Sequence, residues 1–159
     1  MKLLLPLVLV LAACGGTVAS PGPSATLPPE ANGALELVFV DGHAYTLQAD
    51  LYRDLMPGPA PTPKRGVGGT LFVRADVQSD APQGIRADEA WFVNGAEIWE
   101  TVPLPLQTFA ADRHNHLSLS VRDGPTWDTS AKVDVVLRFS TSSGTYFIQK
   151  RAVQIIGAL

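Results

Sequence analysis

From Ala34 to the end of the chain, hydrophobic residues recur at every second position rather than with the helical period of 3.6. Leu117, Leu119 and Val121 alternate with polar residues, and the run from Val133 to Phe139 alternates in the same way. Alternation of this kind is typical of strands with one buried face and one face in water. The pattern therefore predicts paired sheets and argues against a helical bundle.

Turn-forming residues divide this region into about eight short strands. Asp41-Gly42 follows the alternating row Leu35, Leu37 and Phe39, and Asn94-Gly95 is the strongest short hairpin signal in the chain. A proline-rich stretch at 57–63 cannot continue a strand or a helix. No segment predicts a long helix.

The strand pattern resembles the immunoglobulin-like fold in its architecture, with Trp91 placed like the core tryptophan of a central strand. The resemblance implies an all-β domain over residues 34–159, built as an antiparallel β-sandwich of about eight strands. Trp127, which precedes the Val133–Phe139 run, is expected to fill the core at one end of the sandwich.

The N-terminal segment carries a different signal. Lys2 precedes an apolar run from Leu3 to Leu11, and the only cysteine of the chain, Cys14, follows two alanines. As a helix the run would cover about 14 Å, which is too short for a hydrocarbon core of about 30 Å but typical of a secretion signal. The alternative to a lipoprotein signal is an ordinary secretion signal with an incidental cysteine.

Leu11-Ala12-Ala13-Cys14 resembles the lipobox of bacterial lipoproteins. The resemblance implies that residues 1–13 are a signal peptide, that cleavage occurs before Cys14, and that its sulfur carries diacylglycerol. A further acyl chain on the new amino group is also implied, and no other cofactor is expected. Two acyl chains suffice for stable anchoring. The predicted location is extracytoplasmic, on the bacterial cell membrane or the outer membrane.

Residues 14–33 are rich in glycine, proline, serine and threonine and contain one charge. This composition predicts a disordered tether with a reach of roughly 25 Å. The formal net charge of −3 becomes slightly more negative when Lys2 is removed, which argues against binding to nucleic acid. The expected partners are the membrane, through the lipid anchor, and an envelope protein or glycan.

A candidate binding patch follows from the Asn94-Gly95 hairpin. With these two residues as the loop, Trp91 pairs with Ile98 on the core face, while Phe92 and Trp99 point to the other face. Two aromatics on that face are either covered by the tether or the proline-rich loop, or they form a recognition patch. A register shift of one residue would exchange the two faces.

The same hairpin register places Glu89 opposite Glu100, with Asp88 adjacent and Arg86 nearby. Like charges directly across a strand pair are destabilising. A calcium ion would relieve that repulsion, but it takes six to eight oxygen ligands. We therefore expect a solvated strand end here, with a calcium site as the alternative.

A candidate metal site is the His114-Asn115-His116 sequence. Residues two apart share one face of a strand, so both imidazole rings could meet a copper or zinc ion, with Asp112 as a further ligand. Exposed histidines at a strand entry are also common without a metal.

The sequence contains no Gly-x-Ser-x-Gly elbow, and the glycines at 66–69 precede a strand rather than a helix, unlike a phosphate-binding loop. We therefore predict no enzymatic activity. The predicted function is a membrane-anchored envelope lipoprotein that presents a non-catalytic binding or structural module. The alternative is a metal-binding lipoprotein that uses His114 and His116, and a third candidate is an extracytoplasmic enzyme.

Overall fold

The structure is a computed structural model and describes residues 25–57, 65–75, 84–106 and 116–158. Nearly all of its regular structure is strand, so the predicted all-β class is confirmed. Its elements are the 3-10 helix η1 (Pro29–Gly33) and the strands β1 (Leu37–Val40), β2 (His43–Asp54), β3 (Val67–Ala75), β4 (Arg86–Asn94), β5 (Glu97–Thr101), β6 (Leu104–Pro105), β7 (His116–Val121), β8 (Lys132–Thr141) and β9 (Gly144–Ala158).

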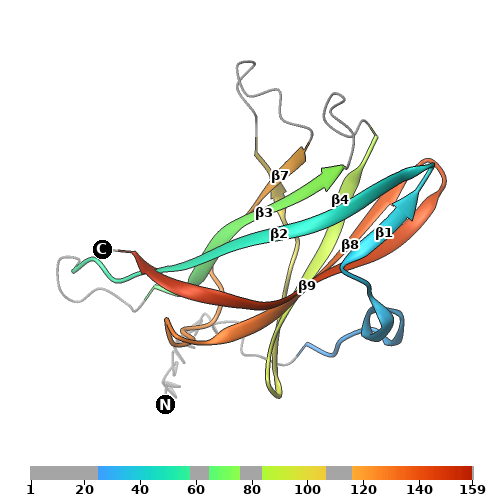
Figure 1. Cartoon of the computed structure of the whole chain (residues 1–159). Coiled ribbons are helices and arrows are strands. Elements are labelled where there is room, and N and C mark those ends of the chain that lie inside the picture. The colour runs from blue at the N-terminus through green and yellow to red at the C-terminus, as the bar shows by residue number, and fades with distance from the viewer. Residues whose placement is uncertain (1–24, 58–64, 76–83, 107–115, 159) are drawn as a thin grey trace, which may run out of the picture.

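The described strands form one curled sheet in the order β5-β4-β8-β9-β2-β3-β7-β6, with β1 added beside β2 (Figure 1). The long strand β9 joins the two halves of the sheet. Its first part runs antiparallel to β8, whereas its last residues run parallel to β2, from Leu51 opposite Ile155 to Asp54 opposite Ala158. The prediction that all strands are antiparallel was therefore wrong.

A bulge in β9 explains how one strand serves both halves. The β8–β9 register shifts by one residue near Ala152, which has a φ of 53°. The backbone N–H of Arg151 donates to Glu36 Oε1 at 3.0 Å, and that of Ala152 donates to Asp134 Oδ1 at 2.8 Å. Because a bulge bends the strand and increases its twist, β9 turns away from β8 and towards β2.

The main core lies inside the curl of the sheet and contains buried side chains from β2, β3, β4, β5, β7, β8 and β9. Its large members include Leu71, Phe92, Trp99, Leu137, Phe139 and Ile148. Trp127 is buried in this core, as predicted, and its indole N–H donates to Glu97 Oε2.

A second, smaller cluster lies on the outer face of β4 and β8. It consists of Ala31, Ala34, Trp91 and Val136, with Leu27, Ile98 and Phe147 packed against it. Ala31 belongs to η1, which lies within the segment predicted to be a disordered tether. That prediction was wrong for residues 29–33, because Ala31 covers an apolar surface that β4 and β8 would otherwise expose.

The β1–β2 hairpin turns at Asp41-Gly42, as predicted. Asp41 and Gly42 both have positive φ, 51° and 82°, and Val40 pairs with His43. Positive φ at both central positions is typical of a type I′ turn, whose twist suits a tight hairpin. The register then places Val38 opposite Tyr45, so both side chains face the main core.

The β4–β5 hairpin differs by one residue from the predicted register. Asn94 still belongs to β4 and pairs with Glu97, so the loop is Gly95-Ala96. Gly95 has a φ of 61°, and it is the one residue of this turn with a positive φ. Phe92 and Trp99 share one face of the hairpin in either register, but they now pair directly, and it is their face that packs in the main core.

Candidate functional site

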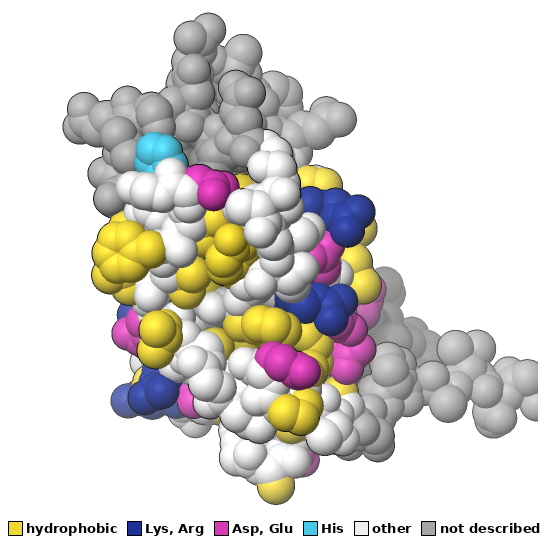
Figure 2. Space-filling model, turned by 90° about the vertical axis from the view of Figure 1, so that its right-hand side faces the viewer, with side chains coloured by type: hydrophobic (Ala, Val, Ile, Leu, Met, Phe, Trp, Pro, Cys, Tyr) yellow, Lys and Arg dark blue, Asp and Glu magenta, His cyan; other side chains and the backbone are white. Residues whose placement is uncertain are grey.

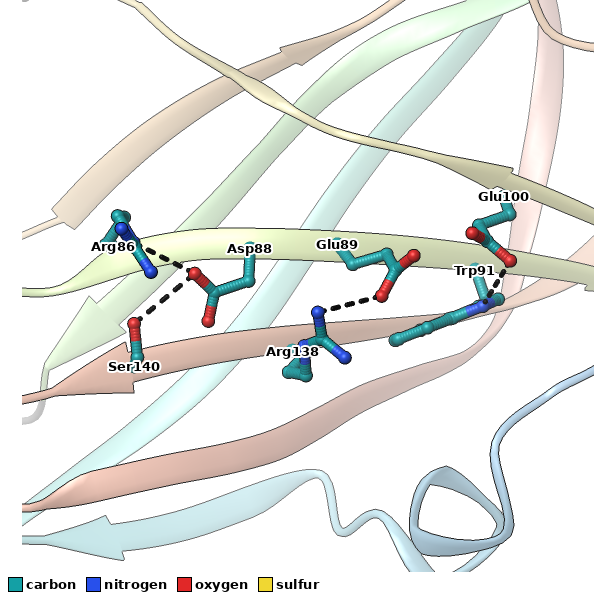
Figure 3. A network of polar contacts seen from close by, with 7 residues as sticks. All are labelled: Arg86, Asp88, Glu89, Trp91, Glu100, Arg138 and Ser140. Atoms are coloured by element: carbon teal, nitrogen blue, oxygen red, sulfur yellow. Dashed lines mark hydrogen bonds and ion pairs between the residues drawn. The ribbon is translucent and has the colours of Figure 1, made fainter.

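The candidate site is a group of polar side chains on the outer face of β4, β5 and β8, here called the polar network (Figure 3). Glu89 pairs with Arg138 of β8, and Trp91 pairs with Glu100 of β5. A register shift between Ala87 and Glu89 leaves Asp88 outside the regular ladder. The members are Arg86, Asp88, Glu89, Trp91, Glu100, Arg138 and Ser140.

Two ion pairs connect the network. Arg138 Nη2 lies 3.0 Å from Glu89 Oε2, and Arg86 Nε lies 2.9 Å from Asp88 Oδ1. Ser140 Oγ also donates to Asp88 Oδ1, at 3.4 Å. These contacts join β4 to β8, so the network ties neighbouring strands together across the surface of the sheet.

Trp91 links the network to the outer cluster beneath it. Its indole N–H donates to Glu100 Oε2 at 3.2 Å, while its ring is buried against Phe147. The Arg138 guanidinium carbon lies 5.8 Å from the centre of the Trp91 ring, within range of a cation–π contact. The Glu100 carboxylate and the Arg138 guanidinium therefore both contact the indole of Trp91.

The pKa of Glu89 is raised above its ordinary value of 4.5. The largest cause is a hydrogen bond to the Glu100 side chain, followed by burial and the negative charge of Glu100, while Arg138 acts in the opposite direction. A hydrogen bond between two carboxyl groups requires a proton on one of them. Glu89 therefore retains its proton to a higher pH than an ordinary carboxyl group does.

The structure brings together the acidic residues singled out in the sequence, but in a different arrangement. Glu89 and Glu100 were predicted to lie directly opposite each other, whereas Glu89 pairs with Arg138 on its other side. Among the described residues, no group of three or more acidic, histidine or cysteine side chains could hold a metal ion. Where the alternative prediction placed calcium, the carboxylates of the network contact the guanidinium groups of Arg86 and Arg138.

The predicted recognition patch was wrong. Phe92 and Trp99 are 0% and 6% exposed, and their rings stack with centres 4.5 Å apart inside the main core. The grouping of side chains was predicted correctly, but the wrong face was assigned to the core: Phe92 and Trp99 pack in the main core, whereas Trp91 and Ile98 lie on the outer face. Trp91 is itself buried by the outer cluster, so this face offers no aromatic platform to a partner.

The predicted metal ligands can be followed only in part. Asp112 and His114 lie outside the described residues, as does Cys14, the predicted site of lipid attachment. His116 begins β7 opposite Arg74, and its ring meets the ring of Phe72 edge-on, with centres 5.3 Å apart. The metal site therefore stays a prediction.

Sequence reasoning missed an exposed apolar row on β1. Leu37 and Phe39 alternate with Val38 and Val40 and point away from the main core, and Leu35, just before the strand, is also exposed. The signal was present, because residues 37–40 are all hydrophobic and the Asp41-Gly42 turn fixes which of them face inward.

No helix among the described residues has the length and hydropathy needed to cross a membrane. Comparisons with protein-family models, with curated proteins and with solved structures find no match for this chain.

Proposed function

We propose that this chain is a bacterial lipoprotein, held at an envelope membrane by diacylglycerol on Cys14. Its all-β domain, of the immunoglobulin-like sandwich type that the strand pattern predicts, acts as a non-catalytic binding or structural module. The observation that carries the proposal is Leu11-Ala12-Ala13-Cys14 at the end of a short apolar run. The same cysteine is the only one in the chain.

The contacts of the polar network support a structural role for that surface. Asp88 and Glu89 are engaged by Arg86 and Arg138, and Glu100 accepts a hydrogen bond from Trp91. Side chains that hold one another across β4, β5 and β8 stabilise the outer face of the sheet. The network thus offers cross-strand support rather than a nucleophile with a base.

The proposal is tested by following acylation of the full chain in a bacterial host. Cells are grown with an alkyne analogue of palmitate, and the purified protein is examined for the label and for the mass of its N-terminal peptide. We expect labelling, an N-terminus at Cys14, and recovery in the membrane fraction. Cys14→Ser should lose all three.

Thr17→Ala is the matched control, because it changes a small polar residue of the same segment outside the lipobox. It should retain the label and the membrane location. Label that persists in Cys14→Ser, or a mature N-terminus at another residue, would overturn the proposal. An unlabelled protein that begins at another residue would support the ordinary secretion signal.

A further inference from the structure

An apolar row of three residues, here called the β1 row, consists of Leu37 and Phe39 on the outward side of β1 and of Leu35 just before the strand. Leu35, Leu37 and Phe39 are 64%, 45% and 69% exposed. Figure 2 views the molecule from the side where β1 and the β8–β9 hairpin lie, and hydrophobic side chains reach the surface there. Outward positions of a half-buried strand are normally polar, so a row of this kind indicates a contact.

The position of the row along the chain indicates what the row contacts. η1 directly precedes the row, and Leu27 and Ala31 hold the chain against the outer cluster. If Cys14 is acylated, only about twelve residues separate the anchor from Leu27, and a chain of that length spans at most about 40 Å. The tether therefore enters the domain close to the β1 row.

We propose that the β1 row rests on the lipid bilayer that holds Cys14, with Leu37 and Phe39 inserted at its interface. This inference depends on the proposed lipid anchor. Amphipathic segments bury their apolar side chains about 5–10 Å into the boundary between headgroups and acyl chains. The exposed side chains of the β1 row can enter this boundary in the same way. The β1 row needs little affinity of its own for the bilayer, because the lipid anchor keeps the row at a high effective concentration near the membrane surface.

A second copy of the chain is a less suitable occupant. Stable protein–protein interfaces bury about 1,200–2,000 Å² in total. Three side chains on and just before one short strand supply a small part of that area. On β2, Thr46 opposite Leu37 is polar and Ala44 opposite Phe39 is small and buried, so the row does not extend across the sheet.

Depth-dependent quenching tests the proposal on the acylated protein. Phe39→Trp is reconstituted into phosphatidylcholine vesicles whose acyl chains carry bromine, and its fluorescence is compared with that in unbrominated vesicles. The three native tryptophans are buried, so the unsubstituted protein supplies the baseline. We expect at least a twofold greater quenching at position 39 than at a control position.

Leu104→Trp is the matched control, because Leu104 is 62% exposed on β6, beyond β3 and β7 from β2. Leu37→Trp is a second reporter on the row and should behave like Phe39→Trp. Equal quenching at positions 39 and 104, with acylated Cys14 confirmed by mass, would overturn this inference and leave the lipid anchor standing. Absence of acylation would overturn both.

Sedimentation of the acylated protein in detergent shows whether the chain is a monomer or a dimer. A monomer supports the bilayer contact. A dimer that Phe39→Glu converts to a monomer would assign the row to a second copy and would contradict the proposal.

Discussion

The β1–β2 and β4–β5 hairpins begin from almost the same turn signal and use it differently. Asp41 and Gly42 both occupy the turn, whereas Asn94 remains in its strand and Gly95-Ala96 forms the loop. The difference shows that an Asx-Gly pair locates a hairpin to within one residue. Packing of the strands then decides the register and which face of the hairpin is buried.

The two hairpins also differ in what covers them. The β4–β5 hairpin is covered on both faces, by the main core inside and by η1 outside. The β1–β2 hairpin is packed on its inner face, while Phe39 on its outer face is exposed. Equivalent substitutions in the two hairpins should therefore have very different effects on stability.

The largest effect is expected for Phe92→Ala. It removes the ring that stacks on Trp99 and leaves a cavity in the main core, so the free energy of unfolding should fall by about 3–5 kcal/mol. Phe39→Ala, the same change in the other hairpin, should alter it by no more than about 0.5 kcal/mol. Urea denaturation followed by tryptophan fluorescence measures both. Similar losses from the two variants would contradict the assignment of faces.

The turns give the second comparison. Asp41→Ala and Gly95→Ala each place alanine at a positive φ, which should cost about 1 kcal/mol of unfolding free energy. Asn94→Ala should cost less, because Asn94 belongs to β4. Gly95 has open space where a side chain would go, so its effect would come from the backbone alone.

Denaturation of these three variants under one set of conditions decides the register. If Asn94→Ala proved as destabilising as Asp41→Ala, the loop would be Asn94-Gly95, as the sequence alone predicts. Phe92 would then lie opposite Glu97 instead of Trp99.

The sequence was sufficient for features that depend on local pattern. Alternation predicted the strands, and Asp41-Gly42 predicted the position of its hairpin turn. The bulge at Ala152 could not be predicted, because the carboxylates that satisfy it come from Glu36 and Asp134, far away in the sequence. The parallel pairing of β9 with β2 depends on that bulge and was missed for the same reason.

The candidate site shows the same division. Glu89 and Glu100 come together through a local hairpin, and their proximity was predicted despite the wrong register. Arg138 reaches Glu89 through the pairing of β4 with β8, which no local signal specifies. The ion pair that organises the site therefore had to come from the structure.

The smallest effect is expected in the pH dependence of stability. Because the folded chain raises the pKa of Glu89 above 4.5, the folded state binds this proton more tightly than the unfolded state. The associated stabilisation is complete below the ordinary pKa and is lost as pH rises through the raised value. Glu89→Gln removes the titrating group and should flatten this decline between pH 4 and neutral pH.

Measurements of unfolding free energy at several pH values test this, with Asp50→Asn as the control because Asp50 lies on β2, away from the polar network. Glu100→Gln should flatten the decline as well, because it removes the carboxylate that raises the pKa of Glu89. A decline that persists in both variants would show that Glu100 does not raise the pKa of Glu89. The β4–β5 hairpin would then be held by Arg138 and the buried aromatic rings, and pH would not distinguish it from the β1–β2 hairpin.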